Sequence, residues 1–156
     1  MSDPQWMRLA IDKAREGIAA RQSPFGAVIV RDGRLVCAAH NRVWADTDPT
    51  AHAEVNAIRQ AARLLGTIAL HGCEMYTTCE PCPMCLSALH WAKLDRVVYG
   101  ADIADATAAG FSELKVPARD LAAAAGSPLR VEGGLLAEEC RELFQRWQQT
   151  PGARSY

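Results

Sequence analysis

Two short segments constrain this chain most, because their side chains have to meet at one metal ion: residues 52–54 (His-Ala-Glu) and 81–85 (Pro-Cys-Pro-Met-Cys). One imidazole and two thiolates suit Zn²⁺, and three protein ligands leave the fourth tetrahedral position to water. The carboxylate of the first segment is not needed as a ligand and suits proton transfer. The pattern therefore predicts a hydrolytic zinc site, with His52, Cys82 and Cys85 as ligands and Glu54 as the catalytic acid and base.

Both segments are expected to begin helices, which would bring the ligands to a common end of the fold. Thr50 can cap a helix that carries the first segment in its first turn and ends at Gly66. Pro81 fits the first position of a second helix, in which the two cysteines lie one turn apart on one face. Helix amino ends stabilise anions, so both thiols are biased toward the thiolate form that binds metal.

Two other uses of the cysteines have to be weighed. Cys79, Cys82 and Cys85 also form a C-x2-C-x2-C pattern, but the further cysteine that iron–sulfur ligation of this kind requires a few residues later is absent. A closed structural zinc site needs a fourth ligand, which Cys79 or Cys73 would have to supply. The carboxylate close behind His52 favours the catalytic interpretation.

The residues around both segments resemble those of a known enzyme superfamily. Residues 49–59 and 79–86 are similar to the cytidine deaminase-like superfamily, whose zinc-dependent nucleobase deaminases share H-x-E followed by P-C-x-x-C. Within this superfamily, residues 130–140 resemble the tRNA adenosine deaminases. The segments that resemble bacterial guanine deaminases are residues 23–28, 91–93 and 109–111, together with Asp105 and Tyr156.

This resemblance implies both a fold and a reaction. The implied fold is a three-layer α/β/α sandwich with a five-stranded mixed sheet, and the implied reaction is hydrolytic deamination of a nucleobase with Zn²⁺ as cofactor. Guanine, giving xanthine and ammonia, is the expected substrate. The alternatives are a tRNA wobble adenosine, or another free base or nucleoside such as cytosine, guanosine or an aminotriazine. A zinc-stabilised binding domain without turnover is the non-enzymatic alternative.

Several residues are expected to contact the substrate. Asn41 resembles the family's base-binding asparagine, and an amide can pair with donors and acceptors on a base edge. Phe25 could stack on a base or pack in the core, and the same two interpretations apply to Trp91. Glu113 stands where guanine deaminases typically carry the second of two aspartates, since this chain has Ser-Glu in place of Asp-Asp. Tyr156 is expected to cover the base.

Composition favours a single domain, residues 1–149, followed by a tail, residues 150–156, that is expected to act as an active-site lid. The chain has 156 residues, of which 49% are hydrophobic, enough for one sizeable core. Its net charge of −1 lacks the basic excess typical of nucleic-acid-binding proteins. Nucleic acid is therefore not an expected partner. The resemblance implies a small nucleobase as substrate and a second copy of the chain in a homodimer. Without a long apolar span or a recognisable signal peptide, a cytoplasmic location is expected.

The chain predicts alternating strands and helices. An apolar stripe after Asp3 indicates a first helix, and Asp32-Gly33 is typical of a hairpin turn. Residues 116–128 fit either a helix or a loop. Strands are expected at residues 27–30, 35–39, 74–78 and 96–99, and a last helix carries Leu136, Cys140, Leu143 and Trp147 on one face. Three cysteines in apolar segments are expected to be buried free thiols: Cys37, Cys73 and Cys140.

Overall fold

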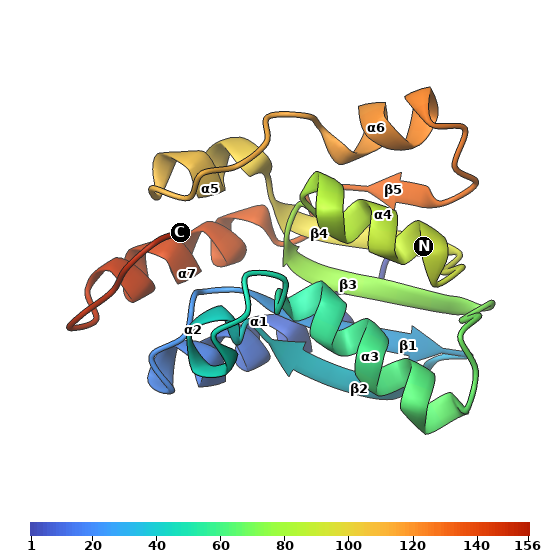
Figure 1. Cartoon of the computed structure of the whole chain (residues 1–156), viewed down its shortest axis with the longest axis horizontal. Helices are drawn as coiled ribbons and strands as arrows, with labels where there is room; N and C mark the ends of the chain where they lie inside the picture. The colour runs from blue at the N-terminus through green and yellow to red at the C-terminus, as the bar shows by residue number, and fades with distance from the viewer.

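The computed structural model describes all residues, Met1–Tyr156, and arranges them around one sheet (Figure 1). The strands are β1 (Gly26–Arg31), β2 (Arg34–His40), β3 (Cys73–Cys79), β4 (Arg96–Ala101) and β5 (Arg130–Glu132). The helices are α1 (Pro4–Ala19), α2 (Val43–Asp46), α3 (Ala53–Leu65), α4 (Pro83–Trp91), α5 (Ile103–Ala108), α6 (Ala118–Ala124) and α7 (Ala137–Gln148).

The five strands form a mixed sheet in the order β2-β1-β3-β4-β5. β1 pairs antiparallel with both β2 and β3, whereas β3, β4 and β5 run parallel to one another. Asp32 and Gly33 join β1 to β2 with φ angles of 50° and 67°, the positive values that a two-residue type I′ hairpin turn requires. The inner strands β1, β3 and β4 are buried along nearly their whole length, which is typical of strands covered on both faces.

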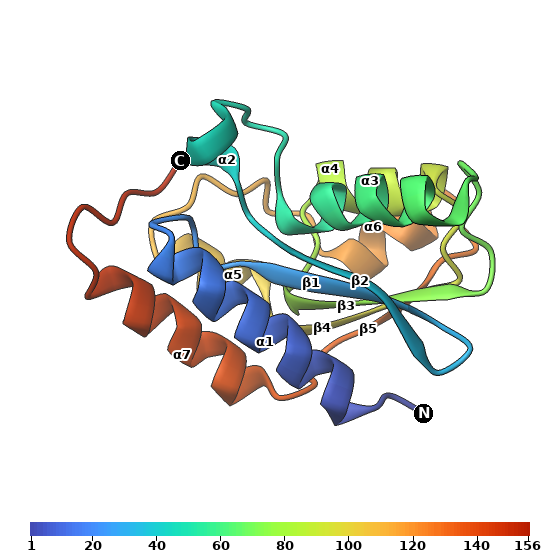
Figure 2. The same cartoon turned by 90° about the horizontal axis from the view of Figure 1, so that it is seen from below.

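Helices cover both faces of the sheet, so the predicted three-layer α/β/α sandwich is confirmed. α1 and α7 lie on one face, while α3, α4 and α6 lie on the other (Figure 2). Each face has its own hydrophobic core, one containing Met7 and Leu143 and the other containing Ala57 and Leu89. α3 and α4 lie side by side, and their amino ends meet at the edge of the sheet where β3 ends (Figure 1).

Both predicted ligand helices are present, but each begins later than predicted. His52 is the residue before α3, with extended backbone (φ −66°, ψ 155°), and so is outside the first turn. Thr50 does not cap this helix, because its hydroxyl donates to Asp48 Oδ1 at 2.7 Å in the preceding turn. Cys82 likewise precedes α4 with φ −63° and ψ 165°, and the proline after it, not the one before it, takes the first helical position. Gly66 ends α3 in the left-handed conformation, as predicted.

The other expected elements are confirmed with small shifts at their ends. The four predicted strands lie within β1 to β4, and α6 occupies the middle of residues 116–128. Leu136 was predicted to lie on the apolar face of the last helix, but it has a left-handed backbone (φ 52°) and precedes α7. The other three predicted residues, Cys140, Leu143 and Trp147, do lie on the buried face of α7. Three short elements, α2, α5 and β5, were not predicted individually, because such short elements carry little hydrophobic periodicity.

The six cysteines are all free thiols. The burial predicted for three of them is confirmed at Cys37, Cys73 and Cys140. The other three lie where β3 ends and α4 begins, beside the candidate site. None of the helices combines the length and the apolar character needed to cross a membrane.

Candidate active site

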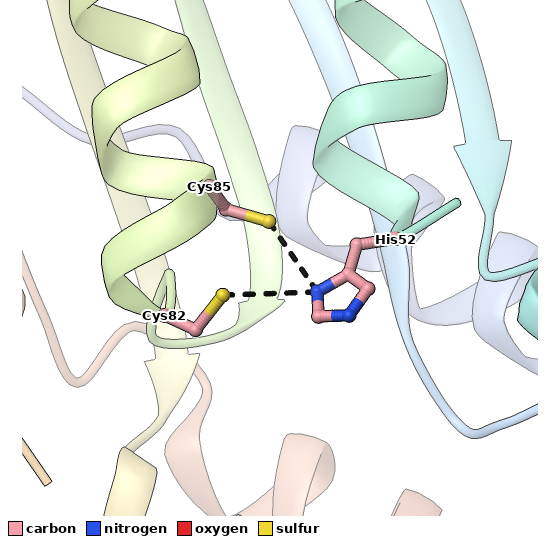
Figure 3. A group of neighbouring side chains, drawn as sticks. All are labelled: His52, Cys82 and Cys85. Atoms are coloured by element: carbon pink, nitrogen blue, oxygen red, sulfur yellow. Dashed lines mark hydrogen bonds between the residues drawn. The ribbon is translucent and has the colours of Figure 1, made fainter. Parts of the chain in front are cut away.

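His52, Cys82 and Cys85 lie together where α3 and α4 begin (Figure 3). His52 Nδ1 is 3.7 Å from Cys82 Sγ and 3.4 Å from Cys85 Sγ, and the three ligand atoms all lie within 4.8 Å of one another. Zinc bonds of about 2.3 Å to sulfur and about 2.0 Å to nitrogen, in tetrahedral geometry, separate the two ligand atoms by about 3.5 Å. The three side chains are therefore spaced as zinc ligands, and their chemistry fits Zn²⁺.

The backbone holds these side chains at the helix starts. The carbonyl of His52 accepts from Asn56 N at 2.9 Å, and the carbonyl of Cys82 accepts from Leu86 N at 2.9 Å. His52 and Cys82 therefore close the first turns of α3 and α4, while their own backbones stay extended. Cys85 lies within the first turn of α4 and points toward the same imidazole nitrogen as Cys82 (Figure 3).

The remaining cysteines of the pattern do not join this group. Cys79 is buried at the end of β3, and its thiol donates to the carbonyl of Asp102 at 3.6 Å. Cys73 lies at the opposite end of the same strand. The chain therefore forms neither the four-ligand structural site nor the three-cysteine cluster considered as alternatives.

The pKa values of the two candidate ligand thiols are shifted in opposite directions. A hydrogen bond from Cys85 lowers the pKa of Cys82 to about 4, and the same contact, with burial, raises the pKa of Cys85 well above its usual range. A divalent cation displaces the remaining proton, because thiols bind zinc as thiolates.

Glu54 lies in the first turn of α3 and is only 6% exposed. Burial raises the pKa of Glu54 to about 7, and the negative charge of Cys82 adds to the effect. A carboxyl group with a pKa near 7 can both take up and release a proton at neutral pH. Its position beside the ligands and its pKa suit the predicted proton-transfer role.

Asn41 and Tyr156, from opposite ends of the chain, meet beside the ligands. Asn41 is fully buried directly after β2, where its Oδ1 accepts from Val43 N at 3.0 Å and its Nδ2 donates to the Tyr156 hydroxyl at 2.7 Å. The Tyr156 ring lies 5.7 Å from the His52 ring and 5.2 Å from the Phe111 ring, measured between centroids. The tail therefore packs over the site of its own chain.

Phe25 and Glu113 line the same cavity as Asn41, Glu54 and Tyr156, and its volume is about 20 Å³. Phe25 also packs edge-on against two core phenylalanines at 5.0 and 5.7 Å, so it belongs to the core and to the cavity wall. Burial raises the pKa of Glu113, and the negative charge of the Cys82 thiolate acts in the same direction. The structure thus brings four of the five predicted substrate contacts to one place.

Trp91 is the exception. It ends α4, and its side chain is 76% exposed, so it is neither in the core nor in the pocket. Cys82 precedes the first turn of the same helix, which puts the two residues about 13 Å apart along the helix axis. Trp91 therefore lies away from the ligand group of its own chain, at the other end of α4, and its contact with the substrate stays a prediction.

Several contacts that hold the tail were not predicted. The Arg154 guanidinium lies 3.7 Å from the centroid of the Trp44 ring, and Trp44 Nε1 donates to the Arg154 carbonyl at 3.3 Å. Ser112 N donates to the carbonyl of Tyr156 at 2.9 Å. A tryptophan in the polar stretch before Pro49 was the one available signal, but nothing in the sequence indicated its partner.

Comparison with known proteins agrees with this geometry. The family model described as the cytidine and deoxycytidylate deaminase zinc-binding region matches residues 1–101. The guanine deaminase of Bacillus subtilis (strain 168) is 47% identical over 114 residues, covering 72% of this chain and 73% of the relative. A tRNA-specific adenosine deaminase of Aquifex aeolicus (strain VF5) is 41% identical over 101 residues, covering 65% of this chain and 67% of the relative.

A solved structure extends the similarity over almost the whole fold. The guanine deaminase from Nitrosomonas europaea superposes with a TM-score of 0.88 at 29% identity, covering 96% of this chain and 86% of that one. The matched family region includes both segments that supply the His52, Cys82 and Cys85 group. This chain therefore belongs to the cytidine and deoxycytidylate deaminase family of zinc-dependent hydrolytic deaminases.

Proposed function

We propose that this protein deaminates guanine to xanthine and ammonia. The observation that carries the proposal is a buried carboxyl, Glu54, beside the three zinc-type ligands in a small cavity that Tyr156 covers. An enclosed cavity suits a flat free base better than a polymer. The choice of guanine is supported by the 47% identity to the guanine deaminase of Bacillus subtilis.

Deamination replaces an exocyclic amine on a ring carbon with an oxygen from water, so protons have to move in both directions. Zn²⁺ held by His52, Cys82 and Cys85 supplies the Lewis acidity that activates water near neutral pH. Glu54 takes a proton from the attacking water and delivers it to the adjacent ring nitrogen. Glu54 then carries the proton of the added hydroxyl to the amine, which leaves as ammonia.

Asn41 and Glu113 are proposed to orient the base. Guanine presents a carbonyl acceptor and neighbouring N–H donors on one edge, so a matching wall needs both a donor and an acceptor. Asn41 Nδ2 is a donor already aimed into the cavity, since it donates to the Tyr156 hydroxyl. The Glu113 carboxyl supplies the acceptor, and Phe25 adds an aromatic wall.

The tail, residues 150–156, is proposed to be the lid. The cavity of about 20 Å³ has room for about one water molecule, so part of its wall, which includes Tyr156, has to move before a purine base fits. The lid is held by side-chain and backbone bonds to three residues around the cavity, which are Asn41, Trp44 and Ser112. Closing it over a bound base would exclude water and order the substrate.

Deamination of a tRNA wobble adenosine is the second candidate function, supported by the 41% identity to the Aquifex aeolicus enzyme. Recognition of an RNA loop needs splayed bases and a basic surface for phosphates. The net charge of −1 and the packed tail favour a free base instead. A purely structural zinc domain would leave the buried Glu54 without a function.

Ammonia release by the zinc-loaded protein tests these functions against one another. The panel should include guanine, cytosine, guanosine, an aminotriazine and a tRNA with a wobble adenosine. We expect release with guanine well above that with the others. Release from the tRNA alone would support the second candidate, and no release from any compound would leave a binding domain.

The homodimer predicted from the sequence is supported by exposed apolar side chains on one face. Leu64, Ile68 and Trp91 are 66%, 89% and 76% exposed, and they lie on or just after neighbouring helices α3 and α4. Apolar groups of this size are common at subunit interfaces. Light scattering would give twice the chain mass if this face pairs, and Trp91→Glu would return a monomer.

The cytoplasmic location stays a prediction.

A further inference from the structure

Glu80, between Cys79 and the ligand Cys82, has a buried carboxylate that is bound only by backbone. It is 8% exposed, and both of its oxygens are used: Oε2 accepts from Ile103 N at 3.0 Å and Oε1 accepts from Ala118 N at 2.8 Å. None of the ion pairs in the molecule includes it. Burying a carboxylate costs desolvation free energy, so a carboxylate at this position is expected to have a structural or functional role.

The two donors lie at the two ends of one segment. Ile103 is the first residue of α5, and Ala118 is the first residue of α6. First-turn N–H groups have no partner within their own helix and need an acceptor from elsewhere. One carboxylate thus binds both ends of residues 103–118, the segment that carries Phe111 and Glu113 into the site.

We call Glu80 and its two hydrogen bonds, to Ile103 N and Ala118 N, the clamp. The backbone of Glu80 is in turn bound to the sheet, and its side chain lies beside the ligands. Glu80 N donates to the Ala101 carbonyl at 2.7 Å, which continues the pairing of β3 with β4. Glu80 also lines two cavities, the small one at the ligands and another of about 630 Å³ bounded by residues of the same segment. The segment therefore borders a cavity, and Glu80 lies between this cavity and the one at the ligands.

We propose that Glu80 is a positioning residue that holds residues 103–118 against the metal-ligand segment, so that Glu113 faces the substrate. This inference rests on the proposed function, in which Glu113 orients the base. It assigns Glu80 no contact with substrate and no proton transfer. Its effect on turnover should therefore pass through Glu113 and should disappear when Glu113 is already disabled.

The test is a double-mutant cycle on the zinc-loaded enzyme with Glu80→Gln and Glu113→Gln. Glu80→Gln keeps the side-chain shape but turns one acceptor into a donor that faces a backbone N–H. We expect it to lower kcat/KM for guanine by about tenfold, through the same parameter, kcat or KM, that Glu113→Gln changes. The double variant should lie within about twofold of Glu113→Gln alone, at unchanged zinc content. Multiplied losses, a change in the other parameter, or loss of zinc would overturn the proposal.

Amide hydrogen exchange gives a readout that does not depend on the substrate. In Glu80→Gln the amides of Ile103 and Ala118 should exchange at least about tenfold faster, while amides within α3 keep their rates. Unchanged exchange at both amides would refute the clamp, even if guanine proves to be the substrate. Accelerated exchange in a protein that does not deaminate guanine would instead overturn the proposed function and keep the clamp.

Two further variants complete the design. Glu74→Gln changes an acid at the other end of β3 that pairs with Arg96, and it controls for loss of a carboxylate from this strand. It should leave both amides and kcat/KM within about twofold of wild type. Ala118→Pro removes only the second donor, at a first helical position where proline is well suited. It should reproduce the kinetic change of Glu80→Gln even if Glu80→Gln does not fold, and wild-type kinetics would contradict the proposal.

Discussion

The metal side and the substrate side of this site are built in different ways. The three ligands come from two helix starts, and each is held by the backbone of its own helix. The substrate wall is assembled from loops, where Asn41 follows β2, Glu113 lies between α5 and α6, and Tyr156 lies beyond α7. These loops are joined by long-range bonds such as that between Asn41 and Tyr156 at 2.7 Å. The His52, Cys82 and Cys85 group is thus held by local structure, while the cavity wall beside it depends on segments distant in the sequence.

The largest effect should follow from breaking the metal side. Cys82→Ala removes one ligand of three, and we expect loss of stoichiometric zinc together with all measurable turnover. Cys79→Ala is the matched control, since Cys79 lies nearby but outside the ligand group, and it should keep one zinc per chain. Metal analysis of both purified variants decides this, and zinc retained by Cys82→Ala would refute the ligand assignment.

Glu54→Gln should leave the metal side intact and stop the chemistry. The amide cannot carry protons, and general acid–base groups typically contribute about 10² to 10⁴ in rate. Because Glu54 serves successive proton transfers, we expect kcat to fall by a factor at or above this range. Zinc content and fold should stay unchanged. A variant that kept a tenth of the wild-type kcat would show that another group moves the protons.

The same substitution should increase the free energy of unfolding of the metal-free protein at high pH. The pKa of Glu54 is raised by burial from 4.5 in the unfolded chain to about 7 in the folded one. The folded state therefore binds more protons between these values, and its stability falls as pH rises. Glu54→Gln has no such proton, so at pH 8 the metal-free variant should be more stable by up to about 3 kcal/mol, and the gain should vanish below pH 4.5. Denaturant unfolding with EDTA measures it, and a gain independent of pH would contradict the assignment.

On the substrate side, removing the lid should have a moderate effect. Deletion of residues 153–156 takes away Tyr156 and Arg154, and with them the bonds to Asn41, Trp44 and Ser112. We expect kcat/KM for the free base to fall by about tenfold, equivalent to about 1.4 kcal/mol, without change in zinc content. Steady-state kinetics with metal analysis tests this, and unchanged kinetics would exclude the lid.

Loosening the lid rather than removing it should change how readily the tail opens, and it should affect turnover least. Trp44→Ala deletes the stacking with Arg154 and one hydrogen bond, each worth about 1 kcal/mol at an exposed position. Trypsin cuts after arginine, so release of Ser155-Tyr156 should accelerate by about threefold to thirtyfold, in proportion to lid opening. Trp91→Ala, at the far end of α4, should cleave at the wild-type rate. Equal cleavage in both variants would show that Trp44 does not hold the tail.

The same contrast explains what could be predicted from the sequence. The ligands and Glu54 were identified because zinc chemistry requires particular residue types at particular spacings. Their helices were placed correctly except at the first turn, where the Asp48 to Thr50 hydrogen bond replaces the expected cap. The inner strands and the Asp32-Gly33 turn followed from short apolar segments and turn chemistry.

The substrate wall was harder to predict because its contacts span the chain. The bonds from Tyr156 to Asn41 and from Arg154 to Trp44 join residues more than a hundred positions apart, and no local pattern specifies them. The surroundings of Trp91 could not be predicted for a related reason. The resemblance of residues 91–93 to guanine deaminases does not say which end of α4 faces the site, and the residue proves to be exposed at the far end.

The central claim is that this metal side and this substrate wall together act on free guanine. Its most direct test is the ratio of kcat/KM for guanine to kcat/KM for a wobble adenosine in a tRNA anticodon stem-loop, measured on one zinc-loaded preparation. We expect xanthine formation and a kcat/KM ratio above about 100, a difference that one or two buried hydrogen-bonding groups can supply. A ratio below one, with inosine as the main product, would contradict it.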